Sequence, residues 1–378
     1  MKVLGKLIFS QVIKSSLFVL LALVALFAFF DLIGQSSKIG TTYTIGQAFM
    51  LTALVLPMRC YQVLPIAVMQ GAIFTLSRLA ATSQFTVMRV SGVSPWKFAS
   101  MLMVPGLVMV LFAYVLGEYV APPAHRYSKV AKLDITGDSF SGKDLDSGIW
   151  VRDVVRDGDG KPTSIRFVNV SSLRPNEAAY DWKIYVFNPE GDMTSIVTAK
   201  EGSYSESEGW VLTDAKEEKL PIIPKQSREV TDEKVEVIHT PRLVWGKHLD
   251  GNIFGLLMVK PEYMSLQELY HYVEYLKSNG QTYKIFDTAF WSKMFYPLAI
   301  LVMLVLAMPF AYQSARAGGM AIKIFCGIMI GILYYALNNI FAFMSVLQSV
   351  PSFISALMPS LMMLILASIA MWWVERRS

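Results

Sequence analysis

Residues 324–374 read IFCGIMIGILYYALNNIFAFMSVLQSVPSFISALMPSLMMLILASIAMWWV, a run of 51 residues without Asp, Glu, Lys or Arg. A helix needs about 20 apolar residues to cross the roughly 30 Å hydrocarbon core of a bilayer. The run is therefore long enough for two spans. The polar, proline-containing segment 348–352 lies near its middle and predicts the turn between them.

Four further apolar runs bring the predicted spans to six, in two groups of three. Two of them, 98–117 and 294–315, contain no charge. The run 15–30 reaches spanning length with the residues just before it, and 45–77 is interrupted by Arg59 alone. The first run could also be a signal peptide. No small-x-small cleavage site follows it, so we predict an uncleaved anchor.

Composition supports the membrane class and argues against nucleic-acid binding. Hydrophobic residues make up 54% of the chain, charged residues 17%, and the mean hydropathy is +0.43. Soluble domains seldom combine these values. Residues 122–287 hold 21 Lys or Arg and 26 Asp or Glu, a net charge of −5, whereas the rest of the chain carries +10. A nucleic-acid partner would require a basic soluble surface, so we expect none.

The basic residues predict how the spans are oriented. Lys and Arg concentrate on the cytoplasmic side of membrane proteins. With the N-terminus inside, the opposing short loops carry only Lys38. Both termini are then cytoplasmic, and residues 122–287 lie outside. The cytoplasmic set comprises Lys2, Lys6, Lys14, Arg78, Arg89, Lys97, Arg316, Lys323, Arg376 and Arg377.

The insert between the third and fourth spans has the pattern of an all-β domain. Alternating β-branched and aromatic residues recur between Gly-, Asn- and Asp-rich turns such as 157–160 and 188–192. An antiparallel sandwich or jelly roll fits this pattern. We expect an apolar interior, in which alternate residues of each strand point one way. The candidates are Ile165, Phe167, Ile184 and Val186.

The insert ends in an amphipathic helix rather than a strand. Ser265 and Glu268 have the spacing of a capping box, an apolar face follows, and Asn279-Gly280 stops the helix. We interpret it as a short helix packed against the mouth of the membrane domain.

Motifs for catalysis or metal binding are missing from the sequence. Gly160-Lys161 is followed by Pro162, so there is no P-loop, and neither a HExxH pair nor a G-x-S-x-G motif occurs. The cysteines lie in apolar runs and predict neither a disulfide nor a metal site. We expect no catalytic residue, no metal and no cofactor bound by this chain.

A few charged residues lie near the membrane-spanning runs. They are Asp31, Lys38, Arg59, Glu118 and Lys293, and a charge at membrane depth is a functional candidate by default. Arg59, midway along its run, is the strongest, with Lys38 and Asp31 beside it as a tentative lipid-binding set. Interface anchoring, or pairing with a partner group, is the competing interpretation.

The cytoplasmic segment 78–97 holds three basic residues and no acidic one. Ser83 could cap a short helix carrying Phe85, Met88 and Val90, which could dock into a cytoplasmic partner. A plain positive-inside loop explains the composition equally well.

The chain resembles the LptF/LptG family of lipopolysaccharide-export permeases over nearly its whole length. Residues 83–94 (SQFTVMRVSGVS) are similar to the family's cytoplasmic coupling segment, and 117–122 (GEYVAP) to its exit from the third span. Residues 266–281, with Trp291-Ser292-Lys293 and Tyr296-Pro297, resemble LptG more than LptF.

The resemblance implies a permease subunit of an ABC transporter that extracts lipopolysaccharide from the inner membrane of a bacterium. Its implied partners are LptF, a dimer of the ATPase LptB that binds the ATP, the protein LptC, and LptA, reached through a periplasmic jelly roll. The implied coupling residues are Gln84, Phe85, Met88 and Arg89. Where the family has Glu, this chain has Gln84, so a charge pair with the ATPase becomes a neutral hydrogen bond.

The expected fold is thus an α-helical membrane protein with six transmembrane helices and an inserted jelly-roll-like periplasmic domain. Expected boundaries are 1–121 and 289–378 for the helices, 122–264 for the β domain and 265–288 for the amphipathic helix and connector. Two alternatives remain: an ABC subunit that relays motion to a periplasmic partner without carrying lipid, and a membrane-anchored sensor or enzyme whose outer domain binds a ligand.

Overall fold

The computed structural model describes residues 2–36, 39–40, 44–136, 149–159, 161–173, 178–205, 207–221, 235–246, 259–312, 319–347 and 350–377. The chain divides into two compact units. The helical unit comprises residues 1–128, 261–270 and 283–378, and the sheet unit comprises 129–260 and 271–282.

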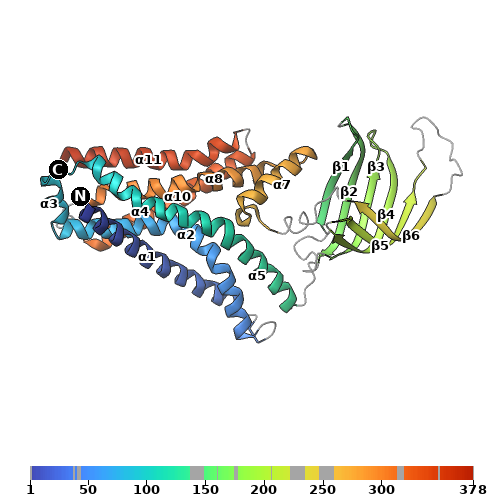
Figure 1. Ribbon diagram of the computed structural model, residues 1–378, viewed down its shortest axis with the longest axis horizontal. Coiled ribbons are helices and arrows are strands. Elements are labelled where there is room, and N and C mark those ends of the chain that lie inside the picture. The colour runs from blue at the N-terminus through green and yellow to red at the C-terminus, as the bar shows by residue number, and fades with distance from the viewer. Residues whose placement is uncertain are drawn as a thin grey trace. The chain divides into compact units, whose positions relative to one another are not determined.

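Long helices build the helical unit (Figure 1). Among the described residues, six helical stretches are long and apolar enough to cross a membrane, as predicted. The third continues past its predicted end through a π-helical turn, and the fourth begins ten residues before the predicted start. The helices are α1 (Lys2–Ser36), α2 (Ile45–Ala81), α3 (Gln84–Val90), α4 (Pro95–Val115), η1 (Leu116–Val120), α5 (Ala121–Thr136), α8 (Lys284–Leu306), α9 (Pro309–Tyr312), α10 (Met320–Leu347) and α11 (Ser352–Arg377).

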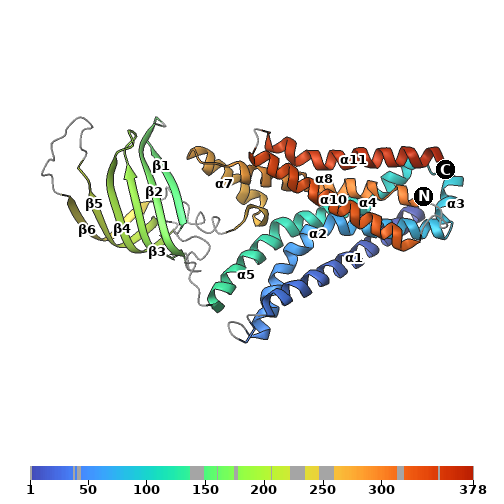
Figure 2. The ribbon, with the colours of Figure 1, turned by 180° about the vertical axis from the view of Figure 1, so that it is seen from behind.

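Glycines let neighbouring helices approach closely. α1 and α2 run side by side in opposite directions (Figure 2), and a Cβ added to Gly71 would overlap the backbone of Ser16. A Cβ on Gly106 of α4 would lie 2.9 Å from the Leu304 side chain of α8. Small residues at helix crossings are typical of membrane proteins, because association there depends on close packing.

The sheet unit is a six-stranded antiparallel meander in the order β1-β2-β3-β4-β5-β6. Glycines with positive φ lie at two of the described hairpin turns, Gly191 at φ 90° between β3 and β4 and Gly209 at φ 83° where β5 begins after β4. The jelly roll stays a prediction, since each described strand pairs with its neighbours in sequence. The strands are β1 (Ile149–Arg156), β2 (Pro162–Leu173), β3 (Ala178–Phe187), β4 (Met193–Ser205), β5 (Gly209–Lys219) and β6 (Glu236–Gly246).

The sheet is strongly curled. Asp181 in β3 and Asp214 in β5 both have φ 54°, and at each the alternation of buried and exposed side chains shifts by one residue. The pairing register also shifts between Val186 and Phe187 and between Trp210 and Val211, and such bulges bend strands and increase their twist. The guanidinium carbon of Arg166 in β2 lies 4.5 Å from the ring centroid of Trp245 in β6, although three strands separate them in the sheet order.

The strand register places the four residues predicted for the sheet interior on two different faces of the sheet. Ile184 pairs with Val168, and both are fully buried on one face. Phe167 pairs with Tyr185, one position along, so its half-buried side chain points to the other face, as does that of Ile165. Val186 shares the face of Ile184 but is half-buried. The expectation that all four share one face is therefore corrected.

Helix α7 (Leu266–Ser278) takes part in both units, because its first five residues belong to the helical unit and the rest to the sheet unit. Within the sheet unit, the Tyr275 hydroxyl donates to the Arg152 carbonyl of β1 at 2.9 Å. The Val154 amide donates to the side chain of Asn279 at 3.0 Å. Burial raises the pKa of Tyr275, so the phenol remains a hydrogen-bond donor. The helix ends where Gly280 has φ 63°, as predicted.

Candidate functional site

A cluster of polar contacts in the helical unit surrounds Glu118, in the π-helical turn η1. Single π-helical turns often occur at functional positions, because the extra residue re-aims nearby side chains. Gly117 permits the turn to lie against Tyr61 of α2, since a Cβ there would overlap the tyrosine ring. Tyr61 in turn stacks on Tyr296 of α8 at 4.3 Å between centroids.

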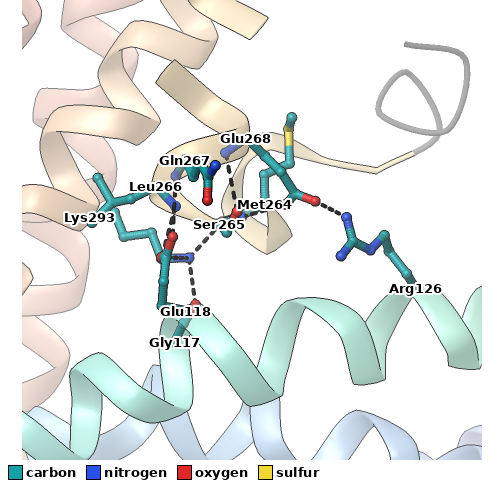
Figure 3. Close-up of polar contacts among 9 residues, drawn as sticks. All are labelled: Gly117, Glu118, Arg126, Met264, Ser265, Leu266, Gln267, Glu268 and Lys293. Atoms are coloured by element: carbon teal, nitrogen blue, oxygen red, sulfur yellow. Dashed lines mark hydrogen bonds and ion pairs between the residues drawn. The ribbon is translucent and has the colours of Figure 1, made fainter. Parts of the chain in front are cut away.

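Lys293 of α8 reaches into the same cluster (Figure 3). Its Nζ donates to the Gly117 carbonyl at 2.8 Å and to the Met264 carbonyl at 2.6 Å, and it lies 3.9 Å from the Glu118 carboxylate. The two charged side chains are 9% and 12% exposed. A buried pair of this kind is stable only when further hydrogen bonds satisfy both groups, as they do here.

Glu118 also holds the beginning of α7. Its carboxylate accepts hydrogen bonds from the backbone amides of Leu266, at 2.9 Å, and Gln267, at 3.2 Å. These amides belong to the first turn of α7, where the helix dipole favours a negative charge. The predicted capping box is present too: Ser265 and Glu268 exchange hydrogen bonds of 2.8 Å and 3.2 Å.

The cluster fastens three segments that are far apart in sequence, namely η1, the start of α7 and α8. Arg126 of α5 adds an ion pair with Glu268 (Figure 3). The sequence indicated Glu118 and Lys293 as charges near the membrane but assigned them no role. The sequence indicated these two residues only through their positions beside uncharged runs. Nothing in the local pattern indicates that they meet.

The three residues predicted for lipid contact have different outcomes. Arg59 of α2 donates two hydrogen bonds to the Asp31 carboxylate of α1, at 2.9 Å and 3.1 Å. The predicted pairing of Arg59 with another group therefore occurs within the chain. Both side chains are partly exposed, 32% for Arg59 and 23% for Asp31. Lys38 lies outside the described residues.

The predicted coupling segment contains helix α3. Phe85 and Met88 are buried in the helical unit, and the Phe85 ring packs edge-on against Phe98 and Tyr312 at 5.1 Å and 4.8 Å. This corrects the expectation that they contact a partner directly. Ser83 also departs from expectation, because its left-handed backbone (φ 58°) leaves the helix without a side-chain cap.

The opposite face of α3 is exposed. Gln84 and Arg89 are exposed, with the Arg89 guanidinium 5.2 Å from the Tyr312 ring centroid. Val87 is 64% exposed and Val90 84%, and Trp96, after the following turn, is 86% exposed. These five residues, named here the α3 face, form the solvent-facing side of the segment.

The sheet interior is not wholly apolar, contrary to expectation. Trp182, Trp210 and Leu212 fill part of it and are at most 1% exposed. Asp153 of β1 and Arg166 of β2, which pair in register, place opposite charges 3.9 Å apart on the same face. Burial lowers the pKa of Arg166, while Asp153 opposes the shift.

The described residues include possible metal ligands. No group of three His, Cys, Asp or Glu side chains there is arranged to hold a metal ion. Cys60 and Cys326 are both free thiols.

Within the described residues, six helical stretches of spanning length and a six-stranded antiparallel sheet are those of a multi-pass membrane protein with a β-rich domain. The chain belongs to the lipopolysaccharide export system permease LptF/LptG family, whose model matches residues 6–373. It is 29% identical to lipopolysaccharide export system permease protein LptG of Haemophilus influenzae, over 95% of this chain and 94% of the relative. It is 28% identical to LptG of Escherichia coli K12, over 99% of this chain and 97% of the relative.

Proposed function

We propose that this chain is an LptG-type permease subunit of a lipopolysaccharide export transporter. The observation that carries the proposal is the extent of the family match, which runs from residue 6 to residue 373 and includes both units. The named relatives are export permeases rather than enzymes, which argues against a membrane-bound enzyme or ligand sensor. Because both relatives are named as lipopolysaccharide export permeases, a subunit that relays motion without carrying lipid is also the less favoured alternative.

The proposed location is the inner membrane of a bacterium, with both termini in the cytoplasm and the sheet unit in the periplasm. The distribution of Lys and Arg supports this orientation. Extracting a lipid costs about 0.8 kcal/mol for each CH₂ group removed from the bilayer, so an energy source is required. In this proposal a dimer of the ATPase LptB supplies it, and LptF is the second permease.

The α3 face supports a contact with that ATPase. Val87, Val90 and Trp96 are large apolar side chains left exposed beside Gln84 and Arg89. Exposed apolar groups rimmed by polar ones are typical of protein interfaces. Phe85 and Met88 contribute indirectly, because their burial joins α3 rigidly to the helical unit. Motion of a docked ATPase would then reach the spans through α3.

The sheet unit is proposed to receive the acyl chains and pass them to LptC and LptA. Its two faces offer a direct comparison. Photo-crosslinkers at Val168 and Ile184 report on the enclosed face, and crosslinkers at Phe167 and Tyr185 report on the other. Capture of lipopolysaccharide at the enclosed pair, dependent on ATP hydrolysis, is the expected result. Capture independent of ATP would count against an ATP-driven conduit, and no capture at either pair would favour a sealed core.

Assembly tests the proposal as a whole. The tagged chain is co-expressed with LptF and LptB, purified in mild detergent and analysed by lipid mass spectrometry. We expect a complex of all three proteins that retains lipopolysaccharide and hydrolyses ATP. A chain that purifies alone and free of lipopolysaccharide would contradict the proposed function.

A further inference from the structure

A small hollow lies between α1 and α2, away from the Glu118 cluster and from the Asp31–Arg59 pair. Its volume is about 100 Å³, enough for a single phosphate group, since one water occupies roughly 30 Å³. The residues that line it are Gln11, Lys14 and Ser15 of α1 and Phe74, Thr75 and Arg78 of α2.

The hollow carries an uncompensated positive charge. Lys14 and Arg78 both line it, and within the described part of the chain neither side chain has an ion pair or hydrogen bond. From residue 1 to residue 117 the sequence contains one carboxylate, Asp31, which is already bonded to Arg59. Two cations facing one hollow therefore lack an anionic partner in this part of the protein.

The two cations also lie at the right depth for a lipid headgroup. Lys14 and Arg78 each end an uncharged stretch, and the next charges along their helices are Asp31 and Arg59. At about 1.5 Å per residue, these separations span about 25 Å along α1 and about 28 Å along α2. This is close to the roughly 30 Å thickness of the hydrocarbon core. Lys14 and Arg78 thus mark one headgroup level, and Asp31 and Arg59 mark the other, so Arg59 lies at the end of a span and not midway along it as its apolar run suggested.

The wall of the hollow provides further hydrogen-bonding groups. Thr75 Oγ1 lies 3.0 Å from Ser15 Oγ and 3.3 Å from the Gln11 carbonyl, and its single proton can be donated to either acceptor. When Thr75 donates to Ser15, the Ser15 proton is available for a further acceptor. Gln11 Oε1 is buried and accepts no hydrogen bond from the described residues. With its amide rotated by 180°, Gln11 would present N–H groups instead. Phe74, 39% exposed, supplies an apolar surface beside the cations.

We propose that this hollow binds the phosphate of an anionic membrane lipid, held by Lys14 and Arg78. The hydroxyl of Ser15 and the amide of Gln11 donate to phosphate oxygens, and Phe74 contacts the glycerol region. The lipid is a resident of the leaflet at this end of the spans and is not the exported cargo. The site is independent of the proposed transport function.

Native mass spectrometry of the full-length chain in detergent tests the site, with phosphatidylglycerol and phosphatidylcholine as probes. We expect tighter binding of phosphatidylglycerol. Lys14→Gln and Arg78→Gln should each weaken it about fivefold, because a basic residue near an anionic membrane contributes about that factor. Lys14→Arg should retain binding. Lys6→Gln is the matched control, since Lys6 is an exposed lysine of α1 outside the hollow.

Three outcomes would overturn the proposal. One is equal binding of the two lipids. Another is an equal loss in Lys6→Gln, which would indicate a diffuse charge effect. The third is displacement of phosphatidylglycerol by excess glycerol 1-phosphate, which would identify a soluble phosphate ligand instead of a lipid. Thermal unfolding of each variant separates loss of the site from loss of the fold.

Discussion

The carboxylate of Glu118 lies 3.9 Å from Lys293 Nζ and at the same time accepts two backbone hydrogen bonds from the first turn of α7. One acidic side chain therefore links α8 to α7. The further bonds of Lys293 to the carbonyls of Gly117 and Met264 reinforce the same three segments. The position of the first turn of α7 in the helical unit thus depends on this buried pair, together with the ion pair between Arg126 and Glu268.

Glu118→Ala is expected to lower the free energy of unfolding by about 3 to 5 kcal/mol, because it leaves the Lys293 ammonium buried without a counter-charge. Hydrogen exchange at the Leu266 and Gln267 amides should rise in the same variant, since both lose their acceptor. Glu274→Gln, an exposed change on α7, is the control. Unchanged exchange at both amides in Glu118→Ala would show that the pair does not hold the helix.

The hydrogen-bonded pair of Asp31 and Arg59 allows a test of whether Arg59 has a structural role or binds lipid. Arg59→Ala is expected to lower the free energy of unfolding by about 2 kcal/mol, because Asp31 loses two charge-assisted hydrogen bonds. The exchanged double variant Asp31→Arg with Arg59→Asp should regain most of this loss.

Lipopolysaccharide-stimulated ATPase activity of the assembled complex distinguishes the two roles. If the pair is structural, the exchanged variant should recover activity together with stability. Recovery of stability without activity would mean that the position of the positive charge matters, and would assign Arg59 to the lipid.

A feature of this protein could be predicted from the sequence only where a local pattern of residues determines it. Spans were predictable because bilayer thickness sets a length of uncharged chain that soluble helices do not need. Turns at Gly191 and Gly280 were predictable because their backbone conformation favours glycine. In contrast, α3 has apolar residues on both sides, so its pattern could not indicate that Phe85 faces inward and Val87 outward. The Glu118–Lys293 pair depends on tertiary packing and has no local signal.

The two sides of α3 should respond differently to substitution. Val87→Asp is expected to preserve the fold, because the side chain is 64% exposed, but to prevent co-purification of LptB by placing a charge in the proposed interface. Phe85→Ala should lower the free energy of unfolding by about 3 to 5 kcal/mol, as expected for a buried aromatic side chain. Pull-down yields combined with thermal unfolding distinguish the two effects. Normal LptB binding by Val87→Asp would place the interface elsewhere.

Replacing Gly71 with alanine tests the close contact between α1 and α2. The added Cβ would overlap the Ser16 backbone, which cannot yield as a flexible side chain can, so the helices must separate. We expect a loss of about 1 to 3 kcal/mol in the free energy of unfolding, typical of overpacking. Gly34→Ala in α1 is the matched control, because nothing lies within 4 Å of its added Cβ. That change should stabilise the chain by about 0.5 to 1 kcal/mol, since alanine is the better helix residue. Thermal unfolding in one detergent compares both variants, and equal behaviour would mean that α1 and α2 do not pack this closely.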